Sequence, residues 1–317
     1  MILDVLDCHM SDLNESAPAM LPAGHRALAA GHGREAPMKR KATDSPGPGA
    51  LRPTAVHFVR HGEVYNPEKV YYGRLPGFHL STAGFEEAAA VGPKLLEAVE
   101  AASDAMPSLR EGPPPAVLHS PLLRARETAE VAMAATKAPL LPDLHEDPRL
   151  LEVCLPYEGR PISDLVDIGF DKLYDHGQPA YEDFAQVFAR VRGLVASLAT
   201  AAEAPASRHV FCFCHGDICM SARLWARKGA AAVTEGRFKR ADVPYPGHCS
   251  VTTLLVDDAV GAAAWPEKVR WLQEAEADRA AAAAKAAAAQ QRAKLAAEAE
   301  ERRKRWRAGE RGHTPLE

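Results

Sequence analysis

Residues 57–67, HFVRHGEVYNP, join the end of an apolar run to a group of polar side chains. The run 54–59, TAVHFV, predicts a buried β-strand, and Arg60, His61 and Gly62 follow it directly. In sheets built from alternating strands and helices, ligands bind beyond the carboxyl ends of the strands. The stretch therefore predicts a strand whose end carries the chemistry of the protein.

The same alternation continues along the chain. Further strands are predicted in 112–120, 207–214 and 249–257, and helices in 81–102, 121–138 and 181–203. In the last helix one face is apolar, and it is formed by Phe184, Val187, Phe188, Val191, Leu194, Val195 and Leu198. This order predicts an α/β fold, a three-layer α/β/α sandwich with a mostly parallel sheet. The polar residues that follow the strands at 60–62, 119–121 and 215–217 would then converge at one rim.

Composition divides the chain into three parts. Residues 1–52 mix Pro, Gly, Ser and scattered charge without periodicity, which predicts a disordered N-terminal extension. Residues 53–262 carry the strand and helix pattern and are expected to form the catalytic domain. Residues 263–317 are rich in Ala, Glu, Lys, Arg and Gln and predict a long, solvated helical tail. At about 1.5 Å per residue, the part from 266 to 308 would measure roughly 65 Å.

Charge and cysteine content favour a cytoplasmic protein. A formal net charge of −4 argues against wholesale binding of nucleic acid or of a membrane surface, and no apolar run is long enough to span a bilayer. The six cysteines show no disulfide-scaffold pattern and are expected to be reduced thiols. Two basic segments leave alternatives open: 24–41 for organelle or nuclear targeting, and 302–307, RRKRWR, for contact with RNA or acidic proteins. An oligomer is also left open.

Five ionisable side chains fit the chemistry of phosphoryl transfer: Arg60, His61, Arg124, Glu152 and His215. Arginine presents forked donors suited to phosphate oxygens and keeps its charge at working pH. A neutral imidazole can attack phosphorus, and neighbouring arginines keep it neutral by lowering its pKa. A carboxylic acid can protonate the departing alcohol and later activate water. Together these side chains predict a phosphohistidine mechanism.

Two glycines accompany the histidines. Gly62 and Gly216 would let the backbone approach a phosphoryl oxygen closely, and a helix N-terminus after the second would add donors. Guanidinium and imidazolium groups can neutralise the phosphoryl charge. Neither a metal nor a cofactor is therefore expected.

A structural zinc site is the alternative for the cysteines around His215. Cys212, Cys214 and Cys219 are close to this histidine in sequence. Tetrahedral zinc sites favour C-x₂₋₄-C spacing, whereas C-x-C on a buried strand points both thiols to one face and the histidine to the other. We expect buried core thiols, with slow modification of Cys212 and Cys214 by thiol reagents.

Three motifs follow one another in the order VRHGEVYN (59–66), SPLLRARETA (120–129) and FCHGD (213–217). In this order they resemble the signatures of the histidine phosphatase superfamily, also called the phosphoglycerate mutase-like family. The resemblance covers residues 54–260, to a close approximation. It implies His61 as the phosphorylated nucleophile, with Arg60, Arg124 and His215 forming the phosphate pocket.

The resemblance also suggests roles for residues outside these motifs. Asn66 corresponds to an asparagine that often contacts the phosphoryl group, although the first motif is one residue shorter than in many members. Glu152 corresponds to the general acid, but the stretch that follows, LPYEG, lacks the usual tryptophan and contains Glu158 as a second carboxyl group. Glu182 and Arg190 are expected to be structural partners.

The expected reaction is hydrolysis of a small organic phosphate monoester. Mutases of this family usually carry long basic insertions, whereas the cations between 128 and 181 are few: Lys137, Arg149, Arg160 and Lys172. Hydrolysis at mildly acidic to neutral pH is the expectation. Phosphoglycerate mutase-type phosphoryl transfer is the first alternative. An inactive family member that serves as a binding module is the second.

Overall fold

The computed structural model of the protein describes residues 52–136, 143–168, 172–200, 205–256, 269–274 and 276–280, with single residues and pairs up to 304. By its contacts the chain divides into two units, 1–45 and 46–317, and the described residues all belong to the second. The N-terminal extension expected at 1–52 lies outside them, except for Arg52. The described residues between 276 and 304 are helical, as the tail composition predicts.

One mixed sheet organises the described chain, in the strand order β3-β2-β4-β1-β5-β6. The strands are β1 (Thr54–Arg60), β2 (Ala116–His119), β3 (Leu144–Glu146), β4 (His209–Cys214), β5 (Val251–Val256) and β6 (Arg270–Trp271). Strands β3, β2, β4 and β1 run parallel to one another, and β5 is antiparallel to both β1 and β6. The prediction of a mostly parallel sheet is confirmed.

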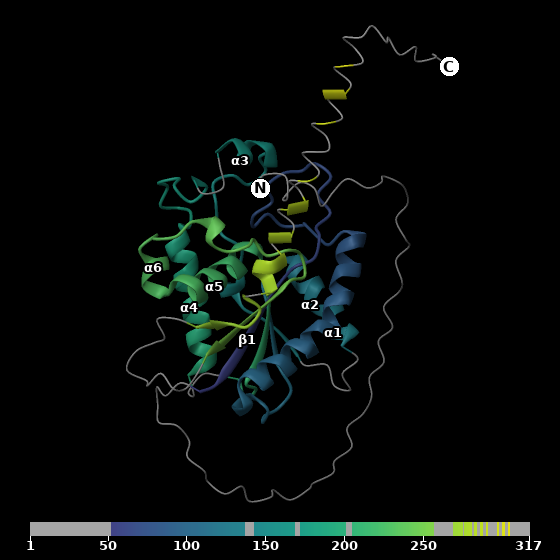
Figure 1. The fold of residues 1–317 in the computed structure, drawn as a ribbon, viewed down its shortest axis with the longest axis vertical. Helices are drawn as coiled ribbons and strands as arrows, with labels where there is room; N and C mark the ends of the chain where they lie inside the picture. Colours follow the sequence, from purple (N-terminus) through teal and green to yellow (C-terminus); the bar gives the residue numbers. More distant parts are fainter. Residues whose placement is uncertain are drawn as a thin grey trace, which may run out of the picture. The chain divides into compact units, whose positions relative to one another are not determined.

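Helices cover both faces of the sheet, which confirms the three-layer sandwich. Figure 1 shows α1 (Thr82–Ala105) and α2 (Leu123–Ala135) on one side of β1, and α4 (Phe184–Ala199), α5 (Gly216–Lys228) and α6 (Ala230–Thr234) on the other. A short helix, α3 (Ile162–Ile168), adds Leu165 to the core on the α4 and α5 side. In the described chain, 3₁₀ turns at Pro107–Leu109, Pro148–Leu150 and Arg240–Asp242 connect these elements. No described helix has the length and apolar character of a membrane span.

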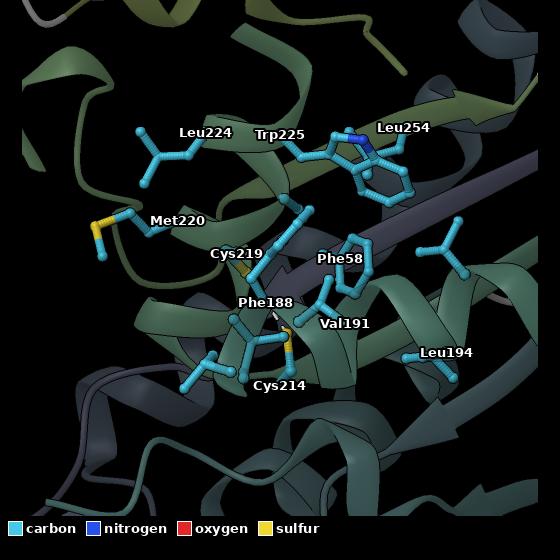
Figure 2. Close-up of a cluster of buried hydrophobic side chains, with 14 of the residues drawn as sticks. Phe58, Phe188, Val191, Leu194, Cys214, Cys219, Met220, Leu224, Trp225 and Leu254 are labelled. Atoms are coloured by element: carbon cyan, nitrogen blue, oxygen red, sulfur yellow. Dashed lines mark hydrogen bonds between the residues drawn. The ribbon is translucent and has the colours of Figure 1, made fainter. Parts of the chain in front are cut away.

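The larger core lies between the sheet and helices α4 and α5 (Figure 2). Phe58 of β1 points into it, and the rings of Phe188 and Trp225 meet edge to face with centroids 5.7 Å apart. All seven apolar residues expected on one face of α4 are buried. Because the helix presents this stripe to the sheet, the periodicity prediction is confirmed.

Local capping explains where the helices begin. Ser81 accepts a hydrogen bond from the backbone N–H of Gly84, as the cap prediction for α1 requires. In α4 the side chain of Asp183 caps the backbone N–H of Gln186, so the helix begins at Phe184, later than the start of the expected segment 181–203. Helix α2 begins at Leu123, two residues after the start of the expected segment 121–138.

The last strand belongs to the same sheet although its sequence lies beyond 262. Trp271 of β6 pairs with Leu254 of β5 and is 3% exposed. The guanidinium of Arg223 lies 4.8 Å from the centre of the Trp271 ring, and Arg227 pairs with Glu274 at 2.8 Å. A catalytic domain bounded at 262 would therefore lose the edge strand of its own sheet. The strand has only two residues, too few for a sequence pattern to reveal it.

Candidate active site

Strand register brings the predicted polar residues to one rim of the sheet. Arg60 at the end of β1 pairs with Cys214 at the end of β4, and His119 at the end of β2 pairs with Phe213. The residues that follow, His61, Ser120 and His215, therefore leave the sheet side by side. The imidazole rings of His61 and His215 have centroids 5.2 Å apart and meet edge to face.

His61 is held in one tautomer by its own backbone. Its Nδ1 lies 2.7 Å from the carbonyl oxygen of Gly62, which can only accept, so the proton is on Nδ1. The Nε2 lone pair is then available for attack on phosphorus. The ring is 2% exposed, and burial together with the charges of Arg124, His215 and Arg60 lowers its pKa well below the usual value. The imidazole is therefore neutral at working pH.

His215 presents its Nδ1 atom to the space to which His61 presents Nε2. Its Nε2 lies 2.8 Å from the hydroxyl oxygen of Ser120, and the backbone N–H of Leu122 donates to that oxygen at 3.3 Å. The serine proton is thus directed to Nε2, which leaves the imidazole proton on Nδ1. This Nδ1 is buried and has no hydrogen-bond partner among the described residues. An anion between the two rings would supply the missing acceptor.

Two arginines add positive charge without carboxylate partners. Arg124 of α2 is 1% exposed and donates to the carbonyl of Gly73 at 2.7 Å, while Arg60 donates to the carbonyl of Pro246 at 2.7 Å. In the described part of the chain neither forms a salt bridge, and the Nε of each is buried without a partner. Buried charges are costly unless paired, so this pair of guanidinium groups marks a site for an anion.

Glu152 supplies a carboxyl group whose pKa lies well above that of an exposed glutamate. It is 9% exposed, and its Oε1 accepts from the backbone N–H of Val153 at 2.9 Å. Burial, and after it the charge of Asp217, raises the pKa of Glu152 to about 7. The positive charges of Arg124 and Arg60 act on the same group and oppose the rise. A carboxylic acid beside a phosphate pocket is suited to general acid catalysis.

Other predicted carboxylates are used to hold loops. Glu158 accepts from the backbone N–H of Arg74 at 2.6 Å. Glu182 pairs with Arg190 at 2.9 Å, as expected of structural partners, and with the Arg74 side chain at 2.5 Å. Arg74 also donates to the backbone carbonyl of Glu152 at 2.6 Å. These contacts fix the loop that carries the acid.

Asn66 closes a loop of its own, and the two glycines are the chain neighbours of His61 and His215. The Asn66 amide closes a short loop by donating to the carbonyl of Val70 at 2.8 Å and accepting its N–H at 3.2 Å. A Cβ at Gly62 would lie 2.5 Å from the carbonyl oxygen of Gly84, so only glycine fits there. Gly216 opens α5 directly after His215, and a Cβ there would lie 2.1 Å from the Tyr245 hydroxyl.

Sequence reasoning assigned no contact to Ser120 and did not single out His248, and the structure brings both to the site together with Tyr72. Ser120 holds His215, Tyr72 stacks under the Arg124 guanidinium at 4.7 Å, and the His248 ring lies 6.0 Å from His61. His248 precedes β5, whose first residue Val251 pairs with Val59 because the two strands are antiparallel. The amino end of an antiparallel strand reaches the same rim as the carboxyl ends of its parallel neighbours. The sequence pattern does not show that β5 is antiparallel to β1, and His248 could not be placed at the site without this information.

The cysteines lie in the core and not around the histidine. Cys212, Cys214 and Cys219 are fully buried, and the sulfur atoms of the last two are 3.5 Å apart (Figure 2). Burial raises the pKa of the Cys212 and Cys214 thiols well above the usual value. Among the described residues, no three His, Cys, Asp or Glu side chains are grouped as metal ligands.

Known proteins share both the sequence pattern and the fold. The Mycobacterium tuberculosis protein Rv0525 is 45% identical over 109 residues, which cover 34% of this chain and 45% of that protein, so less than half of the relative is matched. The solved structure of Bacillus stearothermophilus YhfR matches 69% of this chain and 95% of its own at 25% identity and a TM-score of 0.50. Mycobacterial hydrolase 2 matches 70% and 89% at 23% identity and a TM-score of 0.50.

A sequence profile settles the family, since it covers both histidine motifs and the sheet from within β1 to the end of β5. The profile of the histidine phosphatase superfamily, branch 1, matches residues 56–261. This is more than half of the 317 residues and agrees with the resemblance of the three motifs. The chain belongs to branch 1 of the histidine phosphatase superfamily.

Proposed function

We propose that the protein hydrolyses a small organic phosphate monoester through a phosphohistidine on His61, without a metal. The observation that carries the proposal is the pair of imidazoles, His61 and His215, with ring centroids 5.2 Å apart. Beside them lie the guanidinium groups of Arg60 and Arg124, for which the described residues provide no carboxylate partner in a salt bridge. Such a site attracts a tetrahedral dianion and presents a nucleophile to it.

In the first step His61 takes the phosphoryl group from the ester. The Nε2 lone pair forms a bond to phosphorus while the bond from phosphorus to the ester oxygen breaks. Glu152 gives its proton to that oxygen, and a free alcohol leaves. Arg60, Arg124 and the Nδ1 proton of His215 stabilise the charge on the other phosphoryl oxygens.

In the second step water takes the phosphoryl group from the histidine. The Glu152 carboxylate accepts a proton from the water as its oxygen bonds to phosphorus, and the nitrogen–phosphorus bond breaks. Inorganic phosphate leaves, and His61 returns to its neutral form with the proton still on Nδ1. With the proton taken from water, Glu152 is again a carboxylic acid at the start of the next turnover.

The cations between residues 128 and 181 favour water over a second phosphorylated substrate as acceptor. A mutase must retain a bisphosphate and needs free positive charge for its second phosphate. In the described chain Arg149 pairs with Asp147 at 2.7 Å and Arg160 with Asp164 at 3.1 Å. Because these arginines are already engaged with carboxylates, we propose hydrolysis over mutase-type transfer.

Steady-state assays of the purified chain separate the two reactions. We expect release of inorganic phosphate from p-nitrophenyl phosphate in the presence of EDTA. We expect no efficient conversion of 3-phosphoglycerate to 2-phosphoglycerate. Efficient isomerisation would favour the mutase, and no turnover of any phosphate ester would favour a binding module.

A truncation tests whether the C-terminal tail is accessory. Deleting 281–317 preserves β6, the buried Trp271 and the contacts of Arg227 with Glu274 and Asp278. Hydrolysis should survive this deletion if the catalytic machinery lies between 53 and 271. Loss of turnover in a folded truncated chain would assign a catalytic role to the tail.

A further inference from the structure

A third histidine lies beside the paired imidazoles, and neither the family motifs nor the chemistry above uses it. The ring of His248 has its centroid 6.0 Å from that of His61, and its side chain is 20% exposed. It therefore stands at the solvent side of a site whose other two imidazoles, His61 and His215, are almost fully buried.

The backbone around His248 is tied to the nucleophile. The N–H of Cys249 donates to the carbonyls of Arg60 at 3.1 Å and His61 at 3.4 Å, and the carbonyl of Pro246 accepts from the Arg60 guanidinium. Cys249 has a φ of 50°, in the left-handed region that side chains other than glycine rarely adopt. Strain of this kind persists only where surrounding contacts enforce it and is concentrated at functional sites. Here the left-handed backbone at Cys249 helps to set the direction of the side chain of the preceding residue, His248.

A carboxylate lies within ion-pair distance of the His248 ring. Its Nδ1 lies 3.8 Å from Oε2 of Glu87, a residue of α1, and the same oxygen accepts the backbone N–H of Glu63 at 2.8 Å. The charged and titratable groups around the loop come from β1, the segment after it and α1: Arg60, His61, Glu63, Glu87 and Lys94. Glu87 places a carboxylate beside the His248 ring, whereas burial and the charges of Arg124 and Arg60 lower the pKa of the other two imidazoles, His61 and His215.

We propose that His248, as an imidazolium held by Glu87, binds the phosphoryl group of the substrate as an additional cationic contact beside Arg60. This inference rests on the proposed function for its catalytic consequence, but the binding of phosphate itself does not depend on turnover. His248 is a substrate-contacting residue, and Glu87 is a positioning residue.

The test combines kinetics and binding with His248→Gln, His248→Asn and Glu87→Gln in the full chain. His145→Gln serves as control, because His145 lies exposed on the edge strand β3. p-Nitrophenyl phosphate is the substrate of choice, since nitrophenolate leaves without a proton and removes the pH dependence of Glu152 from kcat/KM. Inorganic phosphate, titrated by calorimetry, is the binding probe.

His248→Gln should lower kcat/KM and weaken phosphate binding by roughly 10- to 100-fold, the loss expected for a charge-assisted hydrogen bond. In the unsubstituted chain both quantities should fall as rising pH deprotonates His248, and the variant should lack this fall. Glu87→Gln retains an oxygen for the Glu63 N–H and should move the fall to lower pH. A merely structural role would leave the pH profile in place.

Each outcome supports or overturns the proposed contact between His248 and the phosphoryl group. Phosphate binding within about twofold of the original in a folded His248→Gln or His248→Asn variant would overturn the inference. An unmoved pH profile in Glu87→Gln would overturn it as well, and this readout remains if both His248 variants fail to fold. Failure of the unsubstituted chain to hydrolyse p-nitrophenyl phosphate would count against the proposed function instead, while phosphate calorimetry would still measure the contribution of His248.

Discussion

The Nδ1 atom of His61 donates to the carbonyl oxygen of Gly62 at 2.7 Å. The N–H of Gly62 in turn donates to the hydroxyl of Thr128 at 3.1 Å, and that hydroxyl donates to the carbonyl of Arg124 at 2.6 Å. One glycine thus sets the tautomer of His61, the proposed nucleophile, and anchors it to the helix that carries Arg124. The geometry of the proposed nucleophile depends on a close backbone approach as much as on side chains.

Replacing this glycine should affect both folding and catalysis. In Gly62→Ala the new methyl group would lie 2.5 Å from the carbonyl oxygen of Gly84, which cannot move aside as a flexible side chain could. We expect a loss of about 1–3 kcal/mol in the free energy of unfolding, the cost of overpacking, together with reduced kcat. Urea titration and steady-state kinetics measure these changes.

Gly193→Ala is the matched control. Gly193 lies within α4, and a Cβ there has no neighbour within 4 Å. This variant should be more stable by about 0.5–1 kcal/mol, because alanine favours a helix interior over glycine, and its activity should be unchanged. Equal stability losses in the two variants would contradict the close-approach account.

Ser120→Ala should damage catalysis without removing a group that contacts substrate. The serine hydroxyl directs the proton of His215 to Nδ1, so its loss leaves Nε2 buried without a partner and the tautomer undetermined. We expect kcat/KM to fall by roughly 10- to 100-fold. Ser120→Thr should recover part of that loss because the hydroxyl is retained. ¹⁵N spectra of the His215 ring distinguish the tautomers, and an unchanged tautomer in Ser120→Ala would contradict this role.

Glu152→Gln should discriminate between leaving groups. With an alkyl phosphate, whose alkoxide must be protonated, we expect kcat/KM to fall by about 10²- to 10⁴-fold. With p-nitrophenyl phosphate the effect on kcat/KM should be much smaller. Because the carboxyl group must be protonated and its pKa is raised to about 7, activity on the alkyl ester should decline above about pH 7.

Glu158→Gln is the control for the acid assignment. Glu158 accepts a backbone N–H from Arg74, and glutamine preserves an oxygen for this bond. The variant should retain the leaving-group dependence and the alkaline decline of the unsubstituted chain. If these properties are lost in Glu158→Gln and kept in Glu152→Gln, the acid is Glu158.

A buried pair of histidines should make stability depend on pH. His57 bonds Thr253 at 3.0 Å and His209 at 3.1 Å, and burial followed by the charge of His209 lowers the pKa of His57 to about 3. The folded protein then binds fewer protons than the unfolded chain between about pH 6.5 and pH 3. The contribution of His57 to the free energy of unfolding is therefore complete above about pH 6.5. As the pH falls below this value, the free energy of unfolding decreases by about 1.4 kcal/mol per pH unit.

Denaturant titrations between pH 7 and pH 5 measure this slope. His57→Leu should reduce the slope, whatever it does to stability at pH 7, because it removes the neutral buried imidazole. His145→Gln, on an exposed histidine of β3, should leave the slope unchanged. An unaltered slope in His57→Leu would show that His57 binds its proton equally well in both states.

Parallel strands explain how much of the site the sequence could predict. His61 and His215 each follow a buried apolar run, and carboxyl ends of parallel strands share a rim, so their convergence follows from pattern and topology. Arg124 follows similarly from the helix that starts after β2. By contrast, His248 precedes a strand, and only the antiparallel pairing of β5 with β1 brings it to the same rim.

Short and irregular segments account for the rest of what the sequence could not predict. The edge strands β3 and β6 have three and two residues, so neither displays an alternating pattern. The choice of Glu152 over Glu158 as the proposed general acid depended on the burial of the two side chains. Their burial differs only in the folded loop, so the sequence could not reveal it. The tautomer-setting contact of Ser120 likewise joins residues 95 positions apart.

Covalent capture of the phosphoryl group tests the central claim most directly. The full chain is mixed with a ³²P-labelled monoester, quenched within milliseconds in base, and digested for peptide analysis. We predict an acid-labile, base-stable label on His61 that forms as fast as turnover requires and is absent from His61→Ala. Sustained hydrolysis with no label on His61, or label on another residue, would contradict the account.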